Sequence, residues 1–289
     1  MKLDGRFAII TGSGQGLGAA IADYYVREGA SVLLCARNLQ SLESVSKSLS
    51  GRLVEGQKVL IQQTDVSDPV QVDKLVSFAL EVFPTIDIVV NNAGIYGPMG
   101  PLEEVDLDEW VHAININLLG TVYVCRAVLP HLKRKKYGKI INVSGGGATN
   151  PLPYITAYAA SKAAVVRFTE SLAEEVRQYG IDANLVAPGA LATRLLDQAI
   201  EAGPNTIGLD FHKRMLAIRD SGGTPLSKGA ELCVFLGSAD SDRITGKLIS
   251  ALWDPWLDFG LYRKDLEQTD VYTLRRIVPS DRGLNFGES

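Results

Sequence analysis

The sequence predicts an α/β fold: a single doubly wound domain with a parallel sheet of about seven strands and helices on both faces. Three observations support this prediction. Short apolar runs alternate with helix-like stretches along most of the chain, which is typical of repeated strand–helix units. The apolar runs are continuous, as in strands that are buried on both faces. Neither an internal repeat nor a clear linker divides the chain, so we expect one domain over residues 1–251.

Each expected element follows from local residue chemistry. Gly29 ends the first helix, and Ser67-Asp68-Pro69 combines a capping residue with a proline in the first helical turn. The expected strands cover residues 7–10, 32–35, 59–61, 86–90, 139–143, 182–186 and 247–251. The expected helices cover residues 17–28, 39–49, 69–83 and 107–133, and a stretch through Tyr158 as far as Tyr179.

Two segments depart from this alternation. Residues 190–225 are interrupted by glycine and proline, and we expect them to form a lid over the substrate. The arginines at 194, 214 and 219 fit either an anionic substrate or a solvated helix face. Residues 252–289 are rich in aromatic residues and arginine, which are enriched at interfaces. We expect this extension to pack on the domain or on a neighbouring subunit, with disorder of its last ten residues as the alternative.

Composition limits the classes of function. The chain has 289 residues, of which 46% are hydrophobic and 21% charged, with a net charge of −4 and a pI near 5.5. This balance argues against a broad nucleic-acid or membrane surface. The three cysteines are scattered, and the three histidines have no ligands at metal-binding spacing, so we expect no metal site. Unpaired cysteines and the lack of an apolar signal core predict a cytoplasmic protein.

A glycine-rich turn follows the first expected strand and opens the first expected helix. Amides at a helix N-terminus bind a pyrophosphate, and glycine lets the ligand approach closely. An ordinary tight turn is the alternative, but the strand–turn–helix context favours a Rossmann-type nucleotide site. The residues expected to bind the cofactor here are Gly12, Ser13, Gly14, Gln15, Gly16, Leu17 and Gly18.

The end of the second strand indicates which cofactor binds. An acid at this position would hold the ribose 2′-hydroxyl of NAD, whereas an arginine accommodates the 2′-phosphate of NADP. The strand ends in Cys35-Ala36-Arg37-Asn38, without an acid. Arg37 therefore favours NADP(H) over NAD(H), although a solvated loop arginine would be compatible with NAD.

Tyr158 and Lys162 are four residues apart in an expected helix, so they share one helix face. A neighbouring ammonium favours the phenolate and lowers the pKa of a tyrosine. Such a phenol could exchange a proton with an alcohol or carbonyl oxygen. Many pairs with this spacing are only surface contacts. Whether this pair is catalytic or a surface contact therefore depends on the motifs that surround it.

Together these motifs resemble the short-chain dehydrogenase/reductase family over about residues 5–250. The similarity lies in the glycine turn, in Asn91-Asn92-Ala93-Gly94, in the Tyr158/Lys162 pair and in Pro188-Gly189. The resemblance implies that Tyr158 is the general acid/base and that Lys162 lowers its pKa and holds the nicotinamide ribose. It implies that Asn117 positions a proton-relay water, with Asn115 as the alternative. Further cofactor contacts implied by it are Asp65, Val66, Asn91, Asn92, Ala93, Gly94, Pro188, Gly189 and Thr193.

One position departs from the family pattern. The family usually has a catalytic serine 13 residues before the tyrosine, where this chain has Gly145. Ser144 is the neighbouring hydroxyl and our candidate for orienting the substrate oxygen, with Thr149 as the alternative. A missing donor at such a position costs roughly 2.7–4 kcal/mol of transition-state stabilisation.

These features predict an NADP(H)-preferring oxidoreductase that interconverts a secondary alcohol and a ketone by hydride transfer. The partners expected are a small carbonyl or alcohol substrate and further copies of the chain in a homodimer or homotetramer. Two other functions use the same fold: a regulatory protein that only binds the cofactor, and an epimerase without net redox change.

Overall fold

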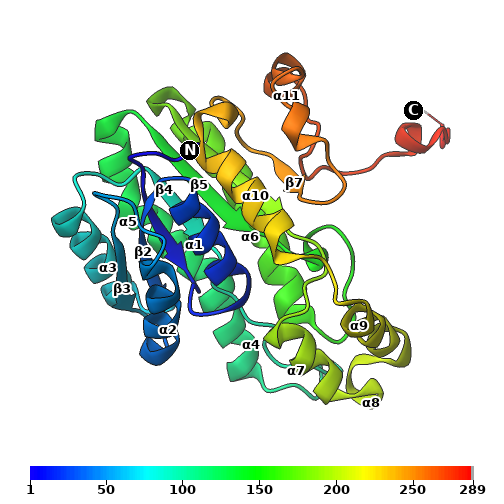
Figure 1. Ribbon diagram of the computed structural model, residues 1–289. Coiled ribbons are helices and arrows are strands. Elements are labelled where there is room, and N and C mark those ends of the chain that lie inside the picture. The colour runs from blue at the N-terminus through cyan, green and yellow to red at the C-terminus, as the bar shows by residue number, and fades with distance from the viewer. Residues whose placement is uncertain (288–289) are drawn as a thin grey trace.

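The computed structural model describes residues 1–287, and it confirms the predicted fold class. Seven parallel strands form one sheet in the order β3-β2-β1-β4-β5-β6-β7, with helices on both faces (Figure 1). The strands are β1 (Phe7–Thr11), β2 (Ser31–Ala36), β3 (Val59–Gln63), β4 (Ile88–Asn91), β5 (Gly138–Val143), β6 (Ile181–Ala187) and β7 (Leu248–Ser250). The helices are α1 (Gly16–Arg27), α2 (Leu39–Ser50), α3 (Pro69–Val82), α4 (Leu107–Ile114), α5 (Gly120–Lys135), α6 (Thr156–Val176), α7 (Arg194–Ala202), α8 (Pro204–Ile207), α9 (Leu209–Ser221), α10 (Leu226–Gly237) and α11 (Arg263–Gln268).

The apolar residues of each strand supply two separate cores. Ala8 and Ile10 of β1 pack on the face that α1, α2 and α10 cover, whereas Ile9 packs on the face of α3, α5 and α6. Successive side chains of a strand point to opposite faces of a sheet. A strand with helices on both sides therefore needs a continuous apolar run, which is the pattern that predicted this sheet.

Two helical regions differ from the expectation. The helix expected over residues 107–133 is divided, because a π-helical stretch over Asn115–Leu119 separates α4 from α5. By length and composition, Leu107–Lys135 could cross a membrane, but Val124 and Val128 of α5 are fully buried in the core of this domain. Helices α7 to α11 were not among the helices given bounds from the sequence, and of these α10 packs on α1.

The strand order reverses between β1 and β4, so the loops that follow these two strands lie next to each other. Asn92 and Ala93 donate their backbone N–H groups to Thr11 Oγ1 over 3.0 and 3.1 Å. In open α/β sheets, ligands bind at this reversal, beyond the carboxyl ends of the strands. The topology thus places the glycine turn and the Asn91–Gly94 segment at one crevice.

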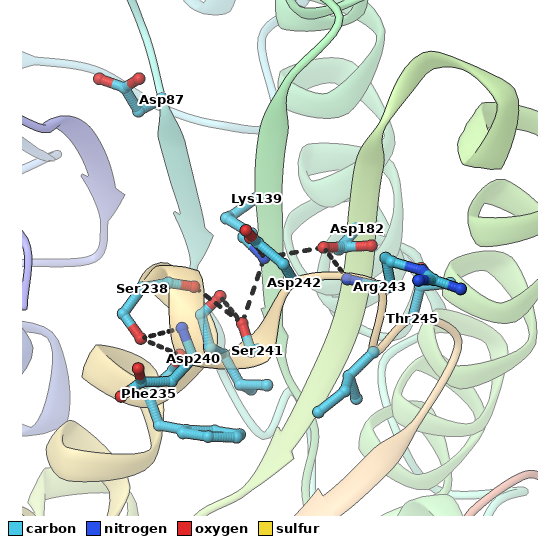
Figure 2. Close-up of polar contacts among 12 residues, drawn as sticks. Asp87, Lys139, Asp182, Phe235, Ser238, Asp240, Ser241, Asp242, Arg243 and Thr245 are labelled. Atoms are coloured by element: carbon cyan, nitrogen blue, oxygen red, sulfur yellow. Dashed lines mark hydrogen bonds and ion pairs between the residues drawn. The ribbon is translucent and has the colours of Figure 1, made fainter. Parts of the chain in front are cut away.

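A buried charge cluster occupies the opposite, amino edge of the sheet. Figure 2 shows Lys139, near the start of β5, donating to Asp182 Oδ2 over 2.7 Å and to Ser241 Oγ over 3.2 Å. Its ammonium also lies 2.7 Å from Asp242 Oδ1. The lysine is only 1% exposed, so it depends on these partners for the hydrogen bonds that water would otherwise supply.

The C-terminal extension is partly packed on the domain. Trp256, Phe259 and Leu266 are buried against the α1/α10 face, whereas Trp253 and Leu261 are 83% and 81% exposed. Figure 1 shows α11 and the following segment extending outward from the helices that cover the sheet. The extension therefore contains both a docked part and an exposed apolar part.

The three cysteines are fully buried and unpaired. Cys35 and Cys125 lie in the core on the α3/α5/α6 face, and Cys233 lies in the core on the α1/α10 face. Burial raises the pKa of the Cys35 and Cys125 thiols to about 12, so these side chains behave as small apolar core residues.

Candidate active site

A cavity of about 1140 Å³ opens at the carboxyl edge of the sheet. Most of the residues that the sequence singled out meet in it, although they come from loops far apart in the chain. Those that line it are Gly12, Gly14, Gln15, Gly16, Leu17, Arg37, Asp65, Val66, Asn92, Ala93, Gly94, Ser144, Tyr158, Lys162, Pro188, Gly189 and Thr193. Ser13, Gly18 and Asn117 are not among the residues that line it.

The glycine turn is built so that no side chain fills the crevice. Gly12 and Gly16 have φ values of 64° and 56°, in the left-handed region that glycine adopts at no steric cost. A Cβ at Gly14 would lie 2.2 Å from Ser41 Oγ. The residues present therefore leave a backbone cradle at the N-terminus of α1, which fits the pyrophosphate of a dinucleotide.

Ser13 and Gly18 support this loop from behind. Ser13 is fully buried, and both its N–H and its Oγ point to the carbonyl oxygen of Cys35. A Cβ at Gly18 would lie 2.4 Å from the Gly12 carbonyl oxygen, so glycine is needed there for α1 to pack close to the turn. Both residues shape the loop without facing the cavity.

The far end of the cavity carries Arg37, Asp65 and Val66. Arg37 is exposed at the end of β2 and has no ion pair within residues 1–287. Asp65 Oδ1 accepts hydrogen bonds from the N–H and the hydroxyl of Ser67 over 2.9 and 2.7 Å. This end therefore offers an exposed guanidinium and a carboxylate that Ser67 holds in place.

Asn117 lies in the π-helical stretch, and its side chain holds the loop after β4. Its Oδ1 accepts from Ile95 N, and its Nδ2 donates to Ile95 O and to Ser161 Oγ, each over 2.9 Å. The amide is thus occupied by protein groups and connects this loop to α6. Asn91, which was also expected at the cofactor, donates to Asn142 Oδ1 in the core over 2.9 Å.

Tyr158 and Lys162 lie on the same face of α6, as their spacing predicts. Both line the cavity while being only 9% and 5% exposed. The Lys162 ammonium donates to the Val143 carbonyl oxygen at the end of β5 over 2.7 Å, and it lies 5.7 Å from the centre of the Tyr158 ring. The end of β5 therefore fixes the lysine beside the tyrosine.

The pKa of Tyr158 is shifted opposite to the expected direction. Burial raises it well above the ordinary value, and the neighbouring Tyr96 adds to this effect. The Lys162 ammonium, 5.7 Å from the centre of the Tyr158 ring, does not offset this effect. Burial lowers the pKa of Lys162 to about 8. In this structure, desolvation sets the direction of the shift for both groups.

Ser144 and Gly145 lie beside the tyrosine. The Oγ of Ser144 is shielded from solvent and has no hydrogen-bond partner among residues 1–287, which is rare for a buried hydroxyl. A Cβ at Gly145 would lie 2.1 Å from the Tyr158 hydroxyl oxygen. In this chain the glycine thus leaves the space that the phenol occupies.

Comparison with known proteins identifies the family. The short chain dehydrogenase family model matches residues 6–203. The chain belongs to the short-chain dehydrogenase family. An L-fucose dehydrogenase of Oryctolagus cuniculus is 33% identical over 238 residues, which are 82% of this chain and 80% of that protein. An uncharacterized oxidoreductase of Bacillus subtilis is 33% identical over 249 residues, which are 86% of this chain and 84% of that protein.

Solved structures of short-chain dehydrogenases share the fold. Levodione reductase has a TM-score of 0.78 and 29% identity, over 86% of this chain and 96% of its own. A gluconate 5-dehydrogenase from Burkholderia cenocepacia, crystallised with NADP and tartrate, has a TM-score of 0.75 and 31% identity, over 86% of this chain and 94% of its own. This chain is therefore similar to dehydrogenases along almost their whole length.

The sequence did not reveal the second half of the dehydrogenase's cavity. Tyr96 packs edge-on against Tyr158, with ring centres 4.8 Å apart. The other unexpected lining residues beyond the tyrosine are mostly apolar, namely Ile95, Leu152, Leu195, Leu196, Phe211, Met215, Ile218 and Trp253. Arg194 and Arg214 of the expected lid also line the cavity, whereas Arg219 pairs with Asp220. Helical apolar residues in α7 and α9 could equally have been ordinary core, so only the tertiary structure identifies them.

Proposed function

We propose that this dehydrogenase interconverts a secondary alcohol and a ketone with NADP(H), using Tyr158 as the general acid/base. The main support for this proposal is that Tyr158 and Lys162 line the same cavity as the glycine cradle. When bound, the reduced nicotinamide supplies the hydride that the carbonyl carbon accepts. Tyr158 gives its proton to the carbonyl oxygen, so that ketone, hydride and proton yield the alcohol.

The surroundings of Tyr158 suit proton donation. Burial keeps the Tyr158 phenol protonated at neutral pH but makes it a weaker acid, so the phenolate formed on proton transfer needs a positive charge nearby. The ammonium of Lys162 stabilises the phenolate that remains after transfer, and the Val143 carbonyl orients that ammonium. Ser144 is the proposed donor to the substrate oxygen, because its buried hydroxyl lacks another partner. Asn117 is the proposed positioning residue, acting through the loop after β4 and Ser161.

Tyr158→Phe tests the chemical step. We expect kcat for ketone-dependent NADPH consumption to fall by about 10²- to 10⁴-fold, while NADPH still raises the melting temperature. Tyr154→Phe is the matched control, since Tyr154 is exposed and does not line the cavity. Steady NADPH consumption by the wild type distinguishes this function from a regulatory protein and from an epimerase. Unchanged turnover in Tyr158→Phe would remove the tyrosine from the mechanism.

Ser144→Ala tests the proposed donor. We expect kcat to fall by about 10²- to 10³-fold, as for comparable donors to a developing oxyanion. Turnover near that of the wild type would transfer the role to another hydroxyl, and Thr149→Ala would then be measured.

NADP(H) preference rests on Arg37. An arginine without an acidic partner at the end of β2 suits a 2′-phosphate. Arg37→Ala should raise KM for NADPH and leave KM for NADH nearly unchanged. Arg52→Ala serves as the control, because Arg52 pairs with Asp23 away from the cavity. Wild-type enzyme that uses NADH better than NADPH would contradict the preference.

We also propose a cytoplasmic homodimer or homotetramer. Three unpaired buried cysteines suit a reducing compartment. The exposed Trp253, Leu257 and Leu261 of the extension form apolar surface that a neighbouring subunit would cover. Light scattering during size-exclusion chromatography tests the assembly, and a monomer at micromolar concentration would contradict it.

A further inference from the structure

The part of the cavity around Tyr158, here called the chamber, has walls from four parts of the chain. The loop after β4 contributes Tyr96, the segment before α6 contributes Leu152, and α7 contributes Leu196. Helix α9 closes the chamber with Phe211, Met215 and Ile218. These side chains belong to one apolar cluster that includes Tyr158 itself. The proton-donating phenol is thus part of an apolar wall.

The polar side chains that line the cavity from these same segments are exposed, namely Thr149, Asn150, Arg194, Asp197 and Arg214. Leu196, Phe211 and Met215 are 3%, 9% and 8% exposed. Arg194 and Arg214 also line the cavity but are exposed, and the Arg214 guanidinium lies over the Phe211 ring at 5.4 Å. Apart from the hydroxyls of Tyr96, Ser144 and Tyr158, the walls around the tyrosine are therefore apolar, and the charged residues of the chamber are exposed.

The apolar walls of the chamber limit which substrates can bind next to Tyr158. A sugar or polyol carries a hydroxyl on nearly every carbon, and each hydroxyl buried without a partner loses its hydrogen bonds to water. An apolar wall can satisfy few of these groups. A carbon skeleton without further hydroxyls, by contrast, gains from every apolar contact.

We infer that the substrate is a compact hydrophobic ketone or secondary alcohol, cyclic or branched, and not a sugar or open-chain polyol. This inference rests on the proposed function for its chemistry and on the chamber for its selectivity. It separates this dehydrogenase from relatives that are named for sugars and sugar acids, such as L-fucose dehydrogenase and gluconate 5-dehydrogenase. The reacting carbonyl would lie at Tyr158, and the remaining carbon skeleton would lie between Leu196, Phe211 and Met215.

The test compares methyl-substituted cyclohexanones with open-chain ketoses, using NADPH and the full-length enzyme. We expect kcat/KM to be at least about 100-fold higher for the cyclohexanones, since a site discriminates by roughly 10- to 200-fold for each methylene that it binds. Equal or better use of the ketoses would overturn the inference.

Binding without turnover separates this inference from the proposed function. With Tyr158→Phe and NADPH present, the cyclohexanones should still raise the melting temperature, and the ketoses should not. If the wild type binds cyclohexanones but reduces neither panel, the proposed reaction fails and the chamber assignment stands. If neither panel binds, or if ketoses bind equally well, the chamber assignment fails.

Two chamber variants locate the selectivity. Met215→Gln places an amide among the apolar walls and should lower kcat/KM for the cyclohexanones by about 10- to 100-fold, mainly through KM. Leu209→Gln is the matched control, because Leu209 lies on the same helix, is 56% exposed and does not line the cavity. Ile218→Thr at a half-buried position gives a second measurement if Met215→Gln does not fold. Unchanged KM in a folded chamber variant would overturn the assignment.

Discussion

Two buried lysines lie at opposite ends of β5, and their hydrogen-bond and charge partners differ. Lys139, near the start of the strand, has two aspartates and a serine as partners. Lys162 of α6 donates to the backbone carbonyl of Val143 at the end of the strand, and no ion pair with it occurs within residues 1–287. The ammonium at the amino edge is thus paired with carboxylates, whereas the ammonium at the carboxyl edge keeps capacity for a ligand. The comparison separates groups that stabilise the fold from groups that serve the site.

Of the variants compared, Lys139→Met should cause the largest loss of stability. Removing the ammonium leaves Asp182 buried without its counter-charge, and a broken buried pair costs about 3–5 kcal/mol. We expect the free energy of unfolding in urea to fall by this amount, while kcat per folded molecule stays constant. Lys47→Met, at an exposed position of α2, should change neither quantity. A variant as stable as the wild type would show that the amino-edge cluster is not structural.

The pH dependence of stability should report the burial of Lys162. The folded pKa of Lys162 is lowered by burial from 10.5 to about 8, so the unfolded chain binds more protons between these values. The stability of the wild type should therefore rise with pH across this window relative to Lys162→Met. The gain should be about 3 kcal/mol, at 1.36 kcal/mol for each pH unit. Urea unfolding at pH 7, 9 and 10.5 measures it, and parallel curves for the two proteins would contradict it.

Gly145→Ala should disturb the carboxyl edge without loosening the fold. The new Cβ would lie 2.1 Å from the Tyr158 hydroxyl oxygen and must displace the phenol, and a misplacement of this kind costs about 10²-fold in rate. The backbone at 145 is extended, with a φ of −165°, so the substitution brings no backbone strain. Gly146→Ala has open space and should keep full activity. Comparable kcat values for the two variants would refute the steric role of Gly145.

Removing the hydroxyl of one of two serines should give the smallest differences in stability. Ser241 Oγ accepts from Lys139 and donates to Leu236 O, so Ser241→Ala should lower the free energy of unfolding by about 1 kcal/mol. Ser144 Oγ has no partner among residues 1–287, so Ser144→Ala should leave stability unchanged or slightly raised. Thermal unfolding of both variants measures this difference. Equal losses would mean that Ser144 is a structural residue.

The regular part of the fold could be predicted because its signals are local. Continuous apolar runs such as Ile88–Val90 require burial on both faces, and Gly12 and Gly16 mark a turn that only glycine makes cheaply. These signals led to the sheet and to the glycine turn that lines one part of the cavity. Helix α10 did not stand out because it follows the irregular segment over residues 190–225, where no capping signal marks its start.

The chemistry of the site was less predictable, because it depends on packing between distant segments. The spacing of Tyr158 and Lys162 correctly places them on one face but does not show how deeply they are buried. The direction of the pKa shift of Tyr158 therefore differed from the expectation. In the same way, the glycine turn could be located, but only the structure shows that Ser13 donates to Cys35 and faces away from the cavity.

The three buried thiols can be used to detect when the helical layers separate from the sheet. A thiol reagent can reach Cys35 and Cys125 only when the layer of α3, α5 and α6 separates from the sheet, and Cys233 only when the layer of α1 and α10 does. Mass spectrometry of the labelled protein would count the modified thiols and time each layer separately. Simultaneous labelling would mean that the domain opens as one unit, and staggered labelling would show which layer yields first.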